Sequence, residues 1–96
     1  MTTVRLPATF HKYAADRVDA SGDTVGEVLR AVVAVHPDLG ERLFDAAGRV
    51  RNHLSVAVGE RLVPHDDVDR TLVGRNDEIL VLVALAGGAT PASRRP

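Results

Sequence analysis

The chain of 96 residues contains no cysteine and no tryptophan, and aromatic residues make up only 3% of it. Without cysteine there is no disulfide framework, no thiolate metal site and no thiol nucleophile, and we expect a cytoplasmic protein. Lysine is almost absent too, because Lys12 is the only lysine among the 12 basic residues. Lys12 is therefore the one side-chain amine available for acyl-transfer chemistry.

The charge balance and the hydrophobic pattern exclude two further classes of partner. The formal net charge is −1 and no basic cluster stands out, so we expect no nucleic-acid partner. The longest apolar run, residues 79–86, is too short to cross a bilayer, and residues 1–6 lack the apolar core of a secretory signal, so we expect no membrane partner. The length suits one domain with a modest core.

The chain offers no evident catalytic or metal-binding constellation. We find no nucleophile–base triad, no acid pair in an evident cleft and no phosphate-binding loop, which argues against an enzyme. Asp66, Asp67 and Asp69 favour a solvated acidic loop over a metal site. The histidines show no metal-ligand spacing, so we expect no bound metal and no bound cofactor; they are His11, His36, His53 and His65.

The first half of the chain predicts two strands followed by helices. Residues 3–6 alternate up to Pro7, and residues 13–20 are a candidate for the second hairpin arm, with Tyr13, Ala15 and Val18 as its inward candidates. Thr24 and Glu27 have the spacing of a capping box, and apolar residues at 25, 28, 29 and 32 form one helical stripe that ends before Pro37. Residues 38–47 suit a second short helix, stopped by Gly48.

The second half predicts three strands. Residues 53–58 alternate cleanly, residues 62–63 form a short edge piece, and residues 65–76 form a polar loop anchored by Val68, Leu72 and Val73. Residues 79–85 form a wholly apolar last strand, as expected of a strand central in its sheet. Placing it between the first and third strands gives an α+β fold of the β-grasp (ubiquitin-like) type, a mixed sheet of four to five strands packed on one main helix.

The two faces of the last strand suggest two different roles. Because side chains alternate in a strand, we assign Ile79, Val81 and Val83 to the core, against the helix. The opposite parity would form an apolar patch on the open sheet face, for docking a partner enzyme, or would simply pack beneath the loop at 65–76. Its residues are Leu80, Leu82 and Leu85.

The last strand runs into Gly87-Gly88, and only residues 89–96 follow. A Gly-Gly segment can thread a narrow tunnel and bring the main chain close to the catalytic groups of another protein. We therefore predict a β-grasp domain over residues 1–88 and a disordered tail over residues 89–96. On the dipeptide alone, a flexible hinge before a tail is the plainer interpretation.

The order and spacing of five segments resemble those of the ThiS/MoaD family of ubiquitin-like sulfur carrier proteins. Within this family, the chain resembles MoaD and the cysteine-biosynthesis carrier more than it resembles ThiS. The resemblance covers about residues 3–88; its segments are SGDTVGEVL (21–29), PDLGERL (37–43), HLSVAV (53–58), NDEI (76–79) and LAGG (85–88).

The resemblance implies a function as carrier, not enzyme. A ubiquitin-activating-type adenylating enzyme would use ATP and Mg²⁺ to adenylate Gly88, and a sulfur donor would convert it to a thiocarboxylate. A sulfur-accepting biosynthetic enzyme would take the sulfur, while Gly87 and Ala86 thread the active site. Because the tail follows Gly88, a JAMM-type metalloprotease is expected to cleave between Gly88 and Ala89. The alternative is a ubiquitin-like interaction or protein-modifier module acting through the sheet face and Gly-Gly tail.

Overall fold

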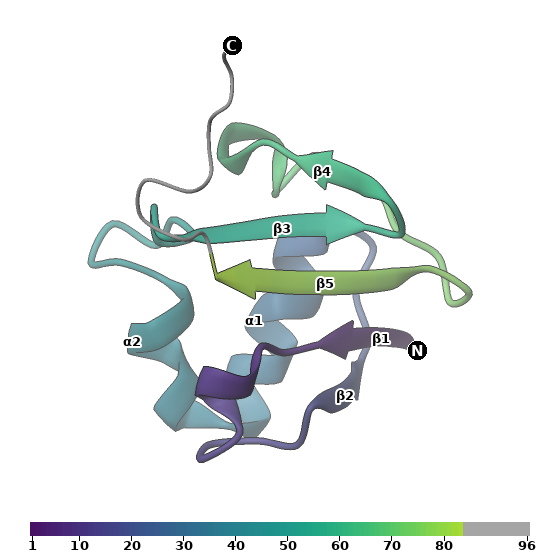
Figure 1. The fold of residues 1–96 in the computed structure, drawn as a ribbon. Coiled ribbons are helices and arrows are strands. Elements are labelled where there is room, and N and C mark those ends of the chain that lie inside the picture. Colours follow the sequence, from purple (N-terminus) through teal and green to yellow (C-terminus); the bar gives the residue numbers. More distant parts are fainter. Residues whose placement is uncertain (84–96) are drawn as a thin grey trace, which may run out of the picture.

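Five strands form one mixed sheet in the order β2-β1-β5-β3-β4, and helix α1 crosses one of its faces (Figure 1). The structure, a computed structural model, describes residues 1–83. The strands are β1 (Thr2–Arg5), β2 (Arg17–Ala20), β3 (Leu54–Val58), β4 (Arg61–Val63) and β5 (Glu78–Val83). The helices are α1 (Val25–Val35) and α2 (Gly40–Leu43), with 3-10 turns at Ala8–Phe10, Pro37–Leu39 and His65–Asp67.

The last strand lies at the centre of the sheet, as the sequence predicts. β5 runs parallel to β1 and antiparallel to β3, so Ile79 has Val4 on one side and Val58 on the other. A central strand must be apolar where the helix covers it, which is the pattern of β5. The β-grasp prediction is confirmed in its strand order and in its single main helix.

The core lies between the sheet and α1. The predicted helical stripe is fully buried at Val28, Leu29 and Val32, and Ile79 and Val81 of β5 are buried with it. The assignment of Val83 to the core is wrong: this side chain is 36% exposed, because it is the last paired residue of β5 and lines a hollow at the end of the sheet. The buried residues that the structure describes all lie between positions 2 and 81.

Helix α1 begins at the predicted cap, with one difference in detail. The Thr24 hydroxyl accepts a hydrogen bond from the Glu27 N–H at 3.2 Å, as in a capping box. The Glu27 carboxylate accepts from the Asp23 N–H at 2.8 Å, one residue before the N-cap. Both bonds hold the turn before the helix in place.

The second strand is much shorter than predicted. The hairpin ladder ends where the Leu6 N–H donates to the Asp16 carbonyl, and residues 8–10 form a 3-10 turn. This turn puts Phe10 into the core, where it is only 4% exposed. Ala15 is exposed, so its predicted inward position is wrong, whereas Tyr13 packs partly against the core.

The second helix is also shorter than predicted. A 3-10 turn at Pro37–Leu39 leads into α2, which ends at Leu43 because Phe44 is extended and bridges to Val50. The chain then reverses at Gly48, whose φ of +83° favours glycine.

The segment between β4 and β5 is fastened to the start of α1. The N–H groups of Val25 and Gly26, which a helix leaves free, donate at 2.9 Å to the carbonyls of Thr71 and Val68. Leu72 is 75% exposed, so its predicted role as an apolar anchor is wrong.

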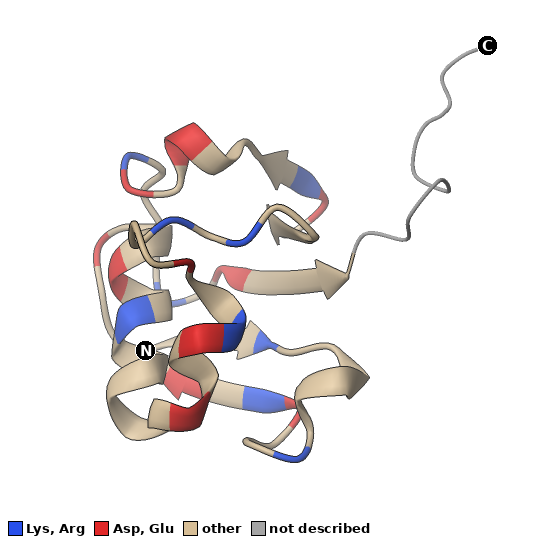
Figure 2. Ribbon diagram, turned by 90° about the vertical axis from the view of Figure 1, so that its left-hand side faces the viewer, with Lys and Arg blue, Asp and Glu red and all other residues tan. Residues whose placement is uncertain are grey.

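Three acidic residues of this segment form ion pairs at the protein surface. Asp69 pairs with Arg30 at 2.7 Å, Asp67 pairs with Arg70 at 3.1 Å, and Asp66 pairs with Arg49. Acidic and basic residues are interspersed along the ribbon in the view of Figure 2. Neither helix within residues 1–83 has the length and apolar character to cross a bilayer.

Candidate functional site

The open face of the sheet, opposite α1, carries an apolar patch. Cross-strand pairing aligns Leu80 of β5 with Ala57 of β3, and Ala57 with Leu62 of β4. Leu82 follows on the same side of β5 and is 43% exposed, while Leu62 is 66% exposed. We call these four residues the sheet-face patch.

A charged border adjoins the sheet-face patch. Arg5 of β1 is aligned with Leu80 on one side and with Arg17 of β2 on the other, so all three lie in one row across the sheet. Both arginines are exposed. Asp19 of β2 and Glu78 of β5 share this face, both aligned with Thr3 of β1, so the apolar centre has charges of both signs beside it.

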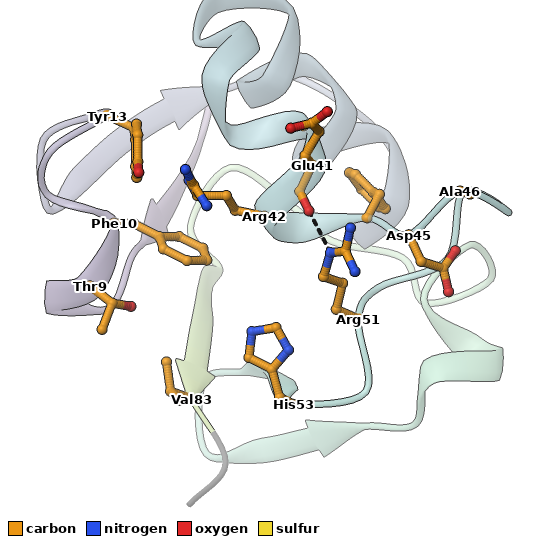
Figure 3. Close-up of a pocket in the computed structure, with 12 residues that line it drawn as sticks. Thr9, Phe10, Tyr13, Glu41, Arg42, Asp45, Ala46, Arg51, His53 and Val83 are labelled. Carbon is orange, nitrogen blue, oxygen red and sulfur yellow. Dashed lines mark hydrogen bonds between the residues drawn. The ribbon is translucent and has the colours of Figure 1, made fainter.

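A second feature lies where β5 ends. Val83 lines a hollow of about 850 Å³ between the end of the sheet, the turn after β1 and helix α2. Figure 3 shows Phe10 and Tyr13 on one wall, Arg42 and Arg51 on another, and His53 and Val83 at the strand end. We call it the terminal hollow.

Neighbouring groups hold the two arginines of the terminal hollow in place. The Arg42 guanidinium lies over the Tyr13 ring, 4.3 Å from its centroid, and the Arg51 Nε donates to the Glu41 carbonyl. Within residues 1–83 neither guanidinium forms a salt bridge, in contrast to those of Arg30, Arg49 and Arg70.

Two carboxylates also line the terminal hollow. Asp45 accepts hydrogen bonds from the Arg49 and Ala47 N–H groups at 3.0 and 2.9 Å. These bonds, above all the one from Arg49, lower the pKa of the Asp45 carboxyl below its ordinary value, and the nearby charges of Arg51 and Arg49 lower it further. The Glu41 carboxylate lies on the side of its backbone away from His53 and Val83 (Figure 3).

The structure describes only part of the predicted site. Leu82 is exposed on the open face and Leu80 is half-buried there, on the side of β5 that was predicted. The remaining predicted site residues lie outside the described residues: Leu85, Ala86, Gly87, Gly88 and Ala89.

The sequence did not lead us to most of the residues that surround this predicted site. Alternation around Val63 could have put Leu62 on the open face, and the hairpin could have put Arg5 and Arg17 there. The terminal hollow had no sequence signal, because it joins residues from three separate segments. No group of three or more His, Cys, Asp or Glu side chains within residues 1–83 is arranged to hold a metal ion.

Comparisons with known proteins agree with the fold and extend it to function. The chain is 29% identical over 90 residues to the sulfur carrier protein CysO of Mycobacterium tuberculosis, covering 90% of this chain and 97% of that one. The crystal structure of that CysO superposes with a TM-score of 0.79 at 26% identity, covering 88% of this chain and 100% of that chain. A chain in the crystal structure of the Amycolatopsis orientalis BexX/CysO complex also superposes with a TM-score of 0.79 at 26% identity, and the match covers 92% of this chain and 100% of that chain.

A modifier protein is similar as well. Small archaeal modifier protein 1 of Haloferax volcanii is 38% identical over 60 residues, which cover 54% of this chain and 69% of that protein. The ThiS family model matches residues 4–88, nearly the whole chain up to the second glycine of the pair. This protein belongs to the ThiS family and is a ThiS/MoaD-type ubiquitin-like carrier or modifier.

Proposed function

We propose that this protein carries sulfur as a thiocarboxylate on Gly88, after removal of residues 89–96. The main support is the position of β5: a central strand, paired on both sides, ends at Val83, and Gly88 follows five residues later. Five extended residues span at most about 16 Å, which limits how far Gly88 can reach from the end of β5. The similarity to CysO supports sulfur as the cargo.

The chemistry needs only the main-chain end of the carrier. The Gly88 carboxylate attacks the α-phosphorus of ATP in the activating enzyme, pyrophosphate leaves, and an acyl adenylate forms. Hydrosulfide then attacks the carbonyl carbon, AMP leaves as the C–S bond forms, and loss of the sulfur-bound proton gives the thiocarboxylate. A carboxylate is a poor electrophile, and the adenylate supplies the leaving group it lacks. The activating enzyme provides ATP and Mg²⁺, so no cofactor on this chain is required.

The sheet-face patch is the proposed docking surface for this adenylating enzyme. Leu82 and Leu62 offer exposed apolar area, and Leu80 lies in the same row as Leu62, with Ala57 between them. Leu85 would extend the patch toward the Gly-Gly segment. The same surface would later meet the sulfur-accepting enzyme, and the two partners would then compete.

The long tail after Gly88 requires a processing step before any of this can occur. We propose cleavage of the Gly88–Ala89 bond by a JAMM-type metalloprotease. Eight further residues would extend about 26 Å beyond Gly88 and would obstruct a narrow adenylation site. Pro91 and Pro96 lack an N–H group and so oppose regular pairing within this tail.

Intact-mass spectrometry tests the proposal. The chain is incubated with the protease, an activating enzyme, ATP and sulfide. The cleaved chain should gain the mass difference between one sulfur and one oxygen atom. Gly88→Ala should block this gain without changing the melting temperature, because the described core ends at Val81. An unchanged mass with an enzyme that charges its own carrier would contradict sulfur carriage.

A second candidate function is protein modification, which the similarity to small archaeal modifier protein 1 favours. Gly88 would then form an amide bond with a lysine of a target protein. The expected product is a stable adduct whose mass is the sum of carrier and target minus water. Such an adduct, in the absence of a thiocarboxylate form, would favour modification over sulfur transfer.

A further inference from the structure

We propose that the terminal hollow receives the carboxylate or thiocarboxylate of the chain's own Gly88 once the chain ends there. This inference rests on the proposed removal of residues 89–96. The hollow would act as a resting site, which holds the terminal carboxylate or thiocarboxylate while the protein is not bound to a partner enzyme.

The chemistry of the hollow suits an anion. Arg42 and Arg51 both line it, and within residues 1–83 neither has a carboxylate partner in a salt bridge. Guanidinium groups bind carboxylates through paired charge-assisted hydrogen bonds. Arg42 is also held against the Tyr13 ring and Arg51 against the Glu41 carbonyl, so little freedom remains to be lost on binding.

Within residues 1–83 neither carboxylate of the hollow forms a salt bridge with these cations, although the Arg51 charge adds to the backbone hydrogen bonds that lower the pKa of Asp45. Asp45 already accepts two backbone hydrogen bonds, and Glu41 directs its carboxylate away from the strand end. The space nearest Val83 therefore faces the arginines, His53 and the buried Phe10 ring (Figure 3).

The reach of the chain makes its own end the favoured occupant. Val83 lines the hollow, and the five residues from 84 to 88 extend at most about 16 Å. A short tether gives an effective concentration in the millimolar range, so even a weak anion site is substantially filled. Gly87 and Gly88 have no Cβ and can make the reversal that this requires. The apolar wall of Phe10, Tyr13 and Val83 suits the Ala-Leu-Ala segment before them.

An acidic side chain of a partner protein could meet the same arginines, and the experiment separates the two. The chain is expressed to end at Gly88, which removes none of the described buried residues, and is compared with the full chain. We expect the Nε–H resonances of Arg42 and Arg51 and the His53 ring resonances to shift in the shorter chain. These shifts should disappear at about 1 M salt, where the Debye length is about 3 Å.

Titration of the carbonyl carbon of Gly88 gives a second measurement. In the chain ending at Gly88, the two guanidinium groups should lower the pKa of the terminal carboxyl by about 0.5 to 1 relative to the R42Q/R51Q double variant. R42K/R51K keeps both charges and should retain part of the effect. R49Q is the matched control, since Arg49 pairs with Asp66 and does not line the hollow.

Identical resonances in the two chain lengths, or the same Gly88 pKa in the double variant, would overturn the resting site and leave only a partner-facing surface. Neither measurement needs sulfur or an activating enzyme. The resting site can therefore fail while sulfur carriage stands, and a missing thiocarboxylate would leave the carboxylate site intact.

Discussion

Arg5 of β1 and Arg17 of β2 are directly opposed across an antiparallel pair, and both lie on the open face of the sheet. Like charges in this position destabilise a sheet, because the two side chains start only about 5 Å apart. Asp19, the next residue of β2 on the same face, is engaged by the Thr3 hydroxyl at 2.8 Å. The repulsion is therefore a local cost at the edge of the proposed docking surface.

Arg17→Gln should stabilise the fold, because it removes this repulsion. We expect the free energy of unfolding in urea at low salt to rise by about 0.2–1 kcal/mol, and the gain to vanish at about 1 M salt. Arg61→Gln is the matched control, since Arg61 is opposed by Val58 and not by a charge. Equal effects of the two substitutions at low salt would show that the repulsion contributes nothing.

Leu82 and Ile79 lie on the same strand, and substitutions at these two positions should affect partner binding and fold stability separately. Leu82→Ser should change stability by less than about 0.5 kcal/mol, since the side chain is 43% exposed. It should weaken binding to the activating enzyme about tenfold, as measured by calorimetry. Ile79→Val should do the opposite, costing about 0.5–1.5 kcal/mol of stability because Ile79 is fully buried. If Leu82→Ser binds like the parent chain, the sheet-face patch is not the docking surface.

The sequence predicted those parts of the fold that periodicity determines. The apolar stripe at Val28, Leu29 and Val32 predicted one helix, and the alternation of β3 predicted one buried sheet face. The apolar character of β5 required a central position. Each of these signals is repeated over several residues, so a single mistake could not change the result.

The remaining differences arise where a single contact determines the structure. Phe10 turns the chain inward after Pro7, and this shortens the second strand. Val83 lies on the same face of β5 as the buried residues, but it stands at the end of the sheet. There, alternation along the strand does not show whether other residues pack over the side chain. The ion pairs of Asp66 and Asp69 join residues 17 and 39 positions apart, so no local pattern indicates them, whereas the pair of Asp67 and Arg70 has a local i,i+3 spacing.

The N-cap of α1 should contribute measurably to stability. Thr24→Ala removes the acceptor of the Glu27 N–H and should lower the free energy of unfolding by about 1 kcal/mol. Thr24→Ser keeps the hydroxyl and should restore most of the loss. Denaturant titration of the three chains checks this, and equal losses for alanine and serine would mean that the methyl group, not the hydroxyl, is responsible.

The Arg30–Asp69 pair predicts a pH dependence of stability. The hydrogen bond from Arg30 is the main cause that lowers the pKa of the Asp69 carboxyl below its ordinary value of 3.8. A lowered pKa in the folded state stabilises the fold above the unfolded value, and this contribution is lost as the pH falls through the folded value. Asp69→Asn should therefore be less stable than the parent chain at about pH 6, and the difference should shrink toward zero below about pH 3. At least half of each side chain is exposed, so the effect is small and should also fade at about 1 M salt. A difference that stays constant from neutral to acid pH would show that Asp69 acts through its shape or its backbone and not through its charge.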